Sequence, residues 1–176
     1  MKATGVVRRI DDLGRIVLPK ELRRTMRIKE GESLEIYTDG DNKIVLKKYS
    51  PVNQMNDFVK EFTESMYTTN KRNIIVTDNE KIVAASGDFG EELTGKKITK
   101  DLEERLKNRN TQIYNSGITL NVCDNYTITN ASVVKPINVF GDVLGCVIVE
   151  GKPQVTDSEK SLAEFGGLFM SRYLEI

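Results

Sequence analysis

The first fifty residues consist of short apolar segments separated by tight turns, and this pattern most limits what the chain can fold into. Residues 3–10 alternate between apolar and polar side chains with a period of about two, and so do residues 34–37 and 44–47. Residues 15–18 form a further apolar segment behind the turn-forming residues 11–14. We predict four short strands here, and no helix of more than a few turns.

One short helix is predicted between these strands. Pro19 suits the first helical position because its missing N–H would have no partner there, and residues 20–26 contain good helix formers. The Asp-Gly-Asp-Asn cluster at 39–42 predicts a hairpin turn. A unit of about fifty residues has a marginal core, and neither cysteine lies in it to staple it. We therefore expect two copies to share one core, so that dimerisation is obligatory.

The charge of the chain is unevenly distributed, although its net charge is zero. Residues 1–50 carry twelve Lys and Arg against eight Asp and Glu, whereas residues 51–176 carry fourteen against eighteen. Within the first 29 residues the count is nine basic against three acidic residues. A concentrated basic segment of this kind is typical of proteins that bind nucleic acid.

Arginines carry most of this basic charge, on both sides of the predicted turn and on the predicted helix. The planar guanidinium can grip a phosphate or bond to guanine O6 and N7 in the major groove, which a lysine cannot do with the same geometry. The alternative is a solvated face in which these arginines pair with Asp11, Asp12 and Glu21. The arginines concerned are Arg8, Arg9 and Arg15 around the turn and Arg23 and Arg24 on the helix.

The stretch from Thr4 to Arg24 resembles the AbrB-type swapped-hairpin DNA-binding domain of bacterial transition-state regulators, and this resemblance favours the DNA-binding interpretation. It runs through Thr-Gly-Val-Val-Arg at 4–8 and Asp-Leu-Gly-Arg-Ile-Val-Leu-Pro-Lys-Glu-Leu-Arg-Arg at 12–24. It implies a β-barrel formed by two chains, with Gly14 in the turn and Pro19 at the helix start. It also implies DNA contacts for four residues and, as additions, for two more: Arg8, Arg15, Arg23 and Arg24, with Arg9 and Lys2. Antitoxins of the same family carry short disordered tails, whereas residues 51–176 are expected to fold.

We expect a second domain over residues 51–176, after a first domain over residues 1–50. Ser50-Pro51 ends the last strand, and apolar residues then recur at helical spacing, which predicts a connector helix over 52–70. Its apolar face either packs in the second domain or pairs with the same helix of a partner chain. The apolar positions are Val52, Met55, Phe58, Val59, Phe62 and Met66.

Two hairpins and two further helices are predicted in this domain. Residues 74–76 and 82–85 form one hairpin, and residues 133–139 and 143–149 form the other, with 143–149 central because it is apolar on both faces. Thr99 caps a helix that carries Leu102 and Leu106, stapled by Ile98. Residues 107–130 give no clear pattern.

The last helix begins at a Thr156–Glu159 capping box, and we expect it to cover the sheet through one face. That face carries Leu162, Phe165, Phe169 and Tyr173. The fold class is therefore α+β, a two-chain swapped-hairpin barrel followed by a GAF-like or PAS-like antiparallel sheet flanked by helices.

The whole chain also resembles sporulation regulators of spore-forming Firmicutes, through residues 46–51 and 141–145. This resemblance implies a C-terminal GAF-like domain, a tetramer formed by pairing those domains through their helices, and both positive and negative control of late forespore genes. The expected partners are double-stranded DNA and further copies of the chain. No run of eighteen apolar residues and no secretory pattern occurs, so we expect no membrane and a cytoplasmic protein.

Three functions are weighed: a DNA-binding regulator, a regulator whose second domain senses an unidentified small molecule, and an enzyme. A pocket around Ile74, Ala84, Val133 and Val147 is the candidate effector site, unless these side chains fill the core. There is no histidine and no standard catalytic, metal or nucleotide motif, so we expect no catalytic residue, metal site or cofactor. Sulfoxide reduction by Cys123 and Cys146 is disfavoured, because Cys146 lies in an apolar strand, and buried free thiols are expected over a disulfide.

Overall fold

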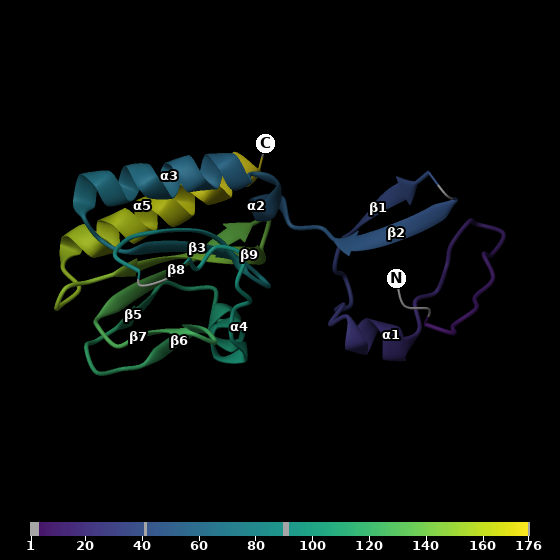
Figure 1. Cartoon of the computed structure of the whole chain (residues 1–176), viewed down its shortest axis with the longest axis horizontal. Helices are drawn as coiled ribbons and strands as arrows, with labels where there is room; N and C mark the ends of the chain where they lie inside the picture. The colour runs from purple at the N-terminus through teal and green to yellow at the C-terminus, as the bar shows by residue number, and fades with distance from the viewer. Residues whose placement is uncertain (1–3, 41, 90–91, 176) are drawn as a thin grey trace. The chain divides into compact units, whose positions relative to one another are not determined.

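The computed structural model describes residues 4–40, 42–89 and 92–175, and the chain divides into two compact units, Met1–Tyr49 and Ser50–Ile176 (Figure 1). The N-terminal unit contains α1 (Lys20–Thr25) and the antiparallel strands β1 (Leu34–Asp39) and β2 (Lys43–Lys48). Leu34 lies opposite Lys48 and Asp39 opposite Lys43, so the predicted hairpin is present and longer than expected. Asp41 of its turn lies outside the described residues.

The strands predicted at 3–10 and 15–18 are wrong for the single chain. The described part of these segments, from Thr4 onward, has no strand pairing, although the turn between them forms. Its backbone N–H groups at Asp11 and Gly14 donate to the carbonyls of Arg15 and Asp11, each at 3.0 Å. A β-ladder needs a neighbouring strand, and no described part of this chain supplies one beside either segment.

Pro19 lies one position earlier than predicted. Its ψ of 147° is extended, so it precedes the first helical residue, Lys20, and its carbonyl accepts a 3.0 Å hydrogen bond from the N–H of Arg23. The proline is therefore the N-cap of α1: it fixes the entry to the helix, and its carbonyl accepts the first hydrogen bond of the helix.

The C-terminal unit is built on a five-stranded antiparallel sheet in the order β4-β3-β9-β8-β5. Its strands are β3 (Ile74–Asp78), β4 (Ile82–Ser86), β5 (Gln112–Tyr114), β8 (Ser132–Val139) and β9 (Asp142–Glu150). Both predicted hairpins are confirmed, and β9 is central as expected. A small second sheet pairs β6 (Leu120–Cys123) with β7 (Tyr126–Ile128), within the region that gave no prediction.

Four helices accompany this sheet. The predicted helix 52–70 is interrupted at Met55, which lies between α2 (Pro51–Gln54) and α3 (Asn56–Asn70). α4 (Lys100–Leu106) is capped as expected by Thr99, whose Oγ1 accepts from the N–H of Leu102 at 3.1 Å. α5 (Asp157–Leu174) begins with the predicted capping box. Within the described residues, no helix is long and apolar enough to cross a membrane.

The sheet separates two apolar cores. On one face, residues of α3 and α5, among them Val59, Met66 and Met170, pack against Val76 and Val147; Figure 1 shows the two helices together on this side. On the other face, residues of α4, β6 and β7 pack against β3 and β9. α3 is therefore part of the core of this unit, which was one of the two roles considered for its apolar face.

The face by which α5 covers the sheet differs from the prediction. Small residues approach the sheet, and a Cβ added at Gly167 would lie 2.2 Å from Cγ of Lys135. In contrast, Phe165 and Tyr173 are 59% and 44% exposed. The helix needs small side chains to lie close to β8, so its aromatic side chains extend over α3 and into solvent.

Candidate nucleic-acid interface

The predicted DNA-binding arginines lie on two segments of the N-terminal unit. Arg8 and Arg9 precede the turn at 11–14, Arg15 follows it, and all three are exposed. Arg23 and Arg24 occupy the last turn of α1, where Arg24 is exposed and Arg23 half-buried. Lys2 lies outside the described residues. The structure thus groups three arginines around one turn and two on one helix.

Arg15 is held by a carboxylate of the same turn. Its Nε donates to Oδ2 of Asp11 at 2.8 Å, and its backbone N–H donates to Oδ1 of Asp11 at 2.7 Å. These backbone and side-chain hydrogen bonds from Arg15 lower the pKa of Asp11 below its usual value. The pair is exposed, so it orients the guanidinium and does not bury it.

The other arginines remain available. Within residues 4–40 and 42–89, and in the described C-terminal part, no carboxylate forms an ion pair with Arg8, Arg9, Arg23 or Arg24. Arg8 Nη1 makes a 3.4 Å contact with the carbonyl of Val7, its neighbour in the chain. The alternative was that these arginines pair with acidic side chains of the same unit. Among the described residues it holds for Arg15, which pairs with Asp11, and not for these four arginines.

The N-terminal unit exposes most of its apolar side chains. Among its described residues, Pro19 is the only buried one. Val7 is 85% exposed and Val17 72%, on either side of the turn. Other exposed apolar side chains of the unit are Val6, Ile10, Leu13, Ile16, Met26, Ile36 and Ile44. A single copy therefore has no core of its own, which agrees with the size estimate from the sequence.

Aromatic side chains gather where α3 and α5 lie side by side, with those of α5 exposed and those of α3, Phe58 and Phe62, half-buried against the core. Ring centroids of Phe58 and Tyr173 are 4.7 Å apart, and those of Phe62 and Phe169 are 5.4 Å apart. Phe165 extends the row, 6.5 Å from Phe62. We call Phe58, Phe62, Phe165, Phe169 and Tyr173 the aromatic surface. The helical spacing of these residues was visible in the sequence. The sequence did not show that the aromatic side chains of α5 would pack against those of α3 instead of the sheet.

The predicted effector pocket is filled. Ile74, Ala84, Val133 and Val147 are all buried in the core between the sheet and the helices α3 and α5. These side chains pack against each other and against the helices, which is the alternative that the sequence left open.

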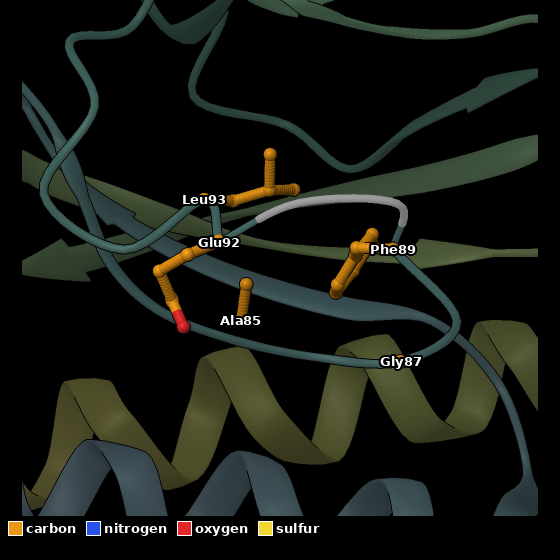
Figure 2. A pocket seen from close by; sticks show the side chains of 5 residues that line it. All are labelled: Ala85, Gly87, Phe89, Glu92 and Leu93. Atoms are coloured by element: carbon orange, nitrogen blue, oxygen red, sulfur yellow. The ribbon is translucent and has the colours of Figure 1, made fainter.

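A different, open pocket lies at the end of β4 and in the loop that follows it. It is lined by Ala85, Gly87, Phe89, Glu92 and Leu93, whose side chains Figure 2 shows gathered around it. Hydrogen bonds from Thr94 lower the pKa of Glu92, so its carboxylate is ionised near neutral pH. The sequence gave no signal for this pocket, because the loop carries no recognisable motif.

The two cysteines are free and buried, as expected. Burial raises the pKa of Cys146 to about 12, against the opposing effect of its 3.3 Å contact with Thr77 Oγ1. A thiol with so high a pKa is a poor nucleophile near neutral pH, which disfavours thiol chemistry there. In the described residues, no group of three or more Cys, Asp or Glu could hold a metal ion.

Comparison with known proteins assigns relatives to both units. The family model described as stage V sporulation protein T C-terminal, transcription factor, matches residues 54–175. The model described as antidote-toxin recognition MazE, bacterial antitoxin, matches residues 7–54. Stage V sporulation protein T of Bacillus subtilis (strain 168) is 37% identical over 177 residues, which cover 99% of each chain.

Two further similarities concern one unit each. Transition state regulatory protein AbrB of the same organism is 63% identical over 51 residues, which cover 29% of this chain and 52% of that protein. The crystal structure of a GAF domain/HD domain protein from Geobacter sulfurreducens has a TM-score of 0.50 and 12% identity, over 73% of this chain and 99% of that chain. The second similarity shows a shared fold, and the predicted α+β architecture with a GAF-like sheet is confirmed.

Proposed function

The chain belongs to the stage V sporulation protein T family of transcription factors, and from this premise we propose that it is a DNA-binding regulator of sporulation. The observation that carries the proposal is the group of exposed arginines in a unit that is 63% identical to AbrB over 51 residues. We assign residues 1–50 to DNA binding and residues 51–176 to assembly.

The proposed DNA contacts come from the turn and from α1. Arginines there neutralise phosphates, which makes binding strongly dependent on salt, and some of them bond to base edges. Because these arginines are few and the helix of the described N-terminal residues, α1, is only six residues long, the sequence preference is degenerate and DNA shape contributes to it. The residues are Arg8, Arg9, Arg15, Arg23 and Arg24, together with Lys2.

The N-terminal unit is proposed to function as a dimer. Residues 4–10 and 15–18 have no strand partner in one chain, and their apolar side chains are exposed. Interleaving with the same segments of a second copy would supply both the strand partners and a shared core. Dimerisation and DNA binding are therefore coupled, since the arginines are attached to these segments.

The C-terminal units are proposed to pair through the aromatic surface, which makes the whole assembly a tetramer. Phe165 at 59% and Leu168 at 56% exposure are large apolar side chains on neighbouring turns of α5. Contiguous exposed aromatic side chains are typical of protein interfaces. Linking two DNA-binding dimers raises the local concentration of the second dimer, so binding to paired sites is tightened.

We favour a scaffold role over effector sensing for the C-terminal unit. Its main core is closed, and the open pocket at Glu92 offers, among its described lining residues, a single charged side chain and no second polar side chain to orient a ligand. A sensor needs a ligand that binds two arrangements of the protein with different affinity. A metabolite that raises the melting temperature of the full-length protein would instead support the sensor hypothesis.

The family relationship supports three finer proposals. The protein acts on late forespore genes, both as activator and as repressor; it works in the cytoplasm, where the chromosome lies; and it is not an enzyme. The first of these is tested by measuring transcript levels in sporulating cells that lack the gene. We expect the transcripts of some forespore genes to fall and those of others to rise.

The central experiment measures DNA binding by the full-length protein on promoter fragments and on random duplex, at several salt concentrations, alongside its molar mass in solution. We expect salt-dependent binding that prefers promoter fragments, by a tetramer. A monodisperse oligomer that binds neither DNA at low salt would contradict the proposal.

A further inference from the structure

We propose that Asp11 is a positioning residue, which holds the Arg15 guanidinium so that it reads a guanine in the major groove. The inference rests on the proposed DNA-binding function of the N-terminal unit. It concerns the residue that gives one of the arginines its sequence preference.

The geometry fixes both partners. Oδ1 of Asp11 accepts from the backbone N–H groups of Leu13 at 3.1 Å and Arg15 at 2.7 Å, so the turn itself holds the carboxylate in place. Oδ2 then accepts from Nε of Arg15 at 2.8 Å. This bond occupies one of the five guanidinium N–H donors, and among the described residues those on Nη1 and Nη2 have no acceptor.

A guanidinium held in this way is better suited to a base edge than to a phosphate. The O6 and N7 atoms of guanine occupy fixed positions, so a bidentate contact gains from a side chain whose orientation is set in advance. A phosphate can be approached from many directions by a mobile side chain. The negative charge of Asp11 also offsets the attraction of Arg15 for phosphate, but it leaves the two Nη groups able to donate.

Arg15 differs in this respect from the other candidates. Across the described residues, neither Arg8, Arg9, Arg23 nor Arg24 is paired with a carboxylate. Those arginines are suited to the neutralisation of phosphates, for which charge and reach matter more than orientation. Specificity is thus assigned to Arg15, and much of the salt-dependent affinity to its neighbours.

The chain offers a matched pair of variants. Asp11→Asn keeps an oxygen acceptor for the backbone N–H groups of the turn, but removes the carboxylate oxygen that accepts from Nε. Asp12→Asn removes the same charge from the adjacent residue, which is exposed and whose side chain forms no hydrogen bond or ion pair with another described residue. Any general gain in affinity from the loss of a negative charge is therefore common to both variants. Arg15→Lys keeps the charge and the turn but lacks the fork.

The experiment selects duplexes from a randomised library with the full-length wild-type protein, and measures Kd for the best duplex and for random duplex. Substitution of 7-deazaguanine at each guanine of that duplex removes single N7 acceptors. We expect one such substitution to weaken wild-type binding about tenfold, and to have little effect on Asp11→Asn and Arg15→Lys. The specificity ratio is the Kd for random duplex divided by the Kd for the best duplex. This ratio should fall about tenfold in Asp11→Asn and should stay at the wild-type value in Asp12→Asn. Melting temperature and molar mass should match the wild type in all variants.

Each other outcome is decisive. If the specificity ratio is as high in Asp11→Asn as in Asp12→Asn, the inference is overturned. The proposed DNA-binding function would then remain intact. Wild-type binding without a sequence preference, or without sensitivity to any 7-deazaguanine, would mean that Arg15 contacts phosphate and would also overturn it. Failure of the wild-type protein to bind any duplex would instead contradict the proposed function itself.

Discussion

The Nε of Arg72 donates a 2.6 Å hydrogen bond to Oε1 of Glu159, and this pair joins the start of β3 to the first turn of α5. The Glu159 side chain is only 1% exposed, and its other oxygen accepts from the N–H and the hydroxyl of Thr156. Burial by itself raises the pKa of this carboxyl, but the hydrogen bonds from Thr156 and Arg72 outweigh it and lower the pKa to about 2. The ionised form therefore stabilises the fold.

Glu159→Gln should lower the free energy of unfolding by about 2–3 kcal/mol at neutral pH. The native pKa lies below that of the unfolded chain, so the stabilisation is complete above about pH 4.5 and is lost as the pH falls towards 2. Urea titrations of the full-length protein followed by circular dichroism should show the two proteins converge over this range. Asp157→Asn, at a 98% exposed side chain of the same helical turn, is the control and should cost less than about 1 kcal/mol. An equal loss at pH 2.5 and pH 7 would contradict the role of the charge.

Alanine at Arg8, Arg15, Arg23 or Arg24 should weaken DNA binding. Loss of a base contact should cost about 1–3 kcal/mol, and loss of a phosphate contact should reduce the salt slope by about one. Fluorescence anisotropy with labelled duplex at four salt concentrations separates the two effects. Arg109→Ala removes the same charge from an exposed position of the C-terminal unit and should leave binding unchanged. Unaltered affinity in all four variants would exclude the proposed interface.

Val17→Asp should dissociate the N-terminal dimer. Val17 is 72% exposed in one chain, so a carboxylate there is harmless to a monomer but is buried without a partner in a shared core. We expect DNA affinity to fall at least about tenfold, because the linked sites are lost. Asn42→Asp introduces the same charge at the exposed tip of the hairpin and serves as the control. Sedimentation analysis that finds the wild-type mass and affinity for Val17→Asp would contradict the two-chain core.

Phe165→Glu should convert a tetramer into a dimer with the fold of each chain intact, because the side chain is exposed and its loss removes an interface contact. Light scattering should show the mass halved. Binding should weaken about a hundredfold on a duplex that spans two sites and stay the same on a single site. Asn125→Glu, in the exposed turn between β6 and β7, is the charge-matched control. A mass that Phe165→Glu does not change would place the interface elsewhere.

The native protein should show no rapidly reacting thiol. Burial holds the pKa of Cys146 at about 12, and Cys123 is 2% exposed, so a thiol reagent such as DTNB should react with both only after unfolding. The measurement is the absorbance change with native and with guanidinium-unfolded protein. One rapid equivalent in the native state would reopen the hypothesis of an enzyme.

Local patterns in the sequence were sufficient for much of the fold. The capping residues Thr99 and Thr156, the hairpin of β8 and β9 and the turn at 11–14 depend on residues within a few positions of each other, so they could be predicted directly. The central position of β9 followed from its apolar side chains on both faces. The AbrB-type domain was recognisable from the order of the residues in the N-terminal motif, and the sporulation regulator family from residues 46–51 and 141–145.

Other features required contacts between residues far apart in the chain. The short strands β5, β6 and β7 form because β8 and the second core accept them, and their sequences alone carry too few residues to show a period. The face of α5 was decided by the close approach of Gly167 to Lys135. Residues 4–10 and 15–18 show the reverse case, since they have the pattern of strands and lack a neighbour in one chain.

The sequence by itself thus determined the local elements, the division of charge and the arginines of the N-terminal unit, because these depend on side-chain chemistry and short-range hydrogen bonds. Only the tertiary structure decided which side chains of α5 remain exposed and where the open pocket lies. Those features depend on distances between atoms, which are set when the whole chain packs its apolar surface.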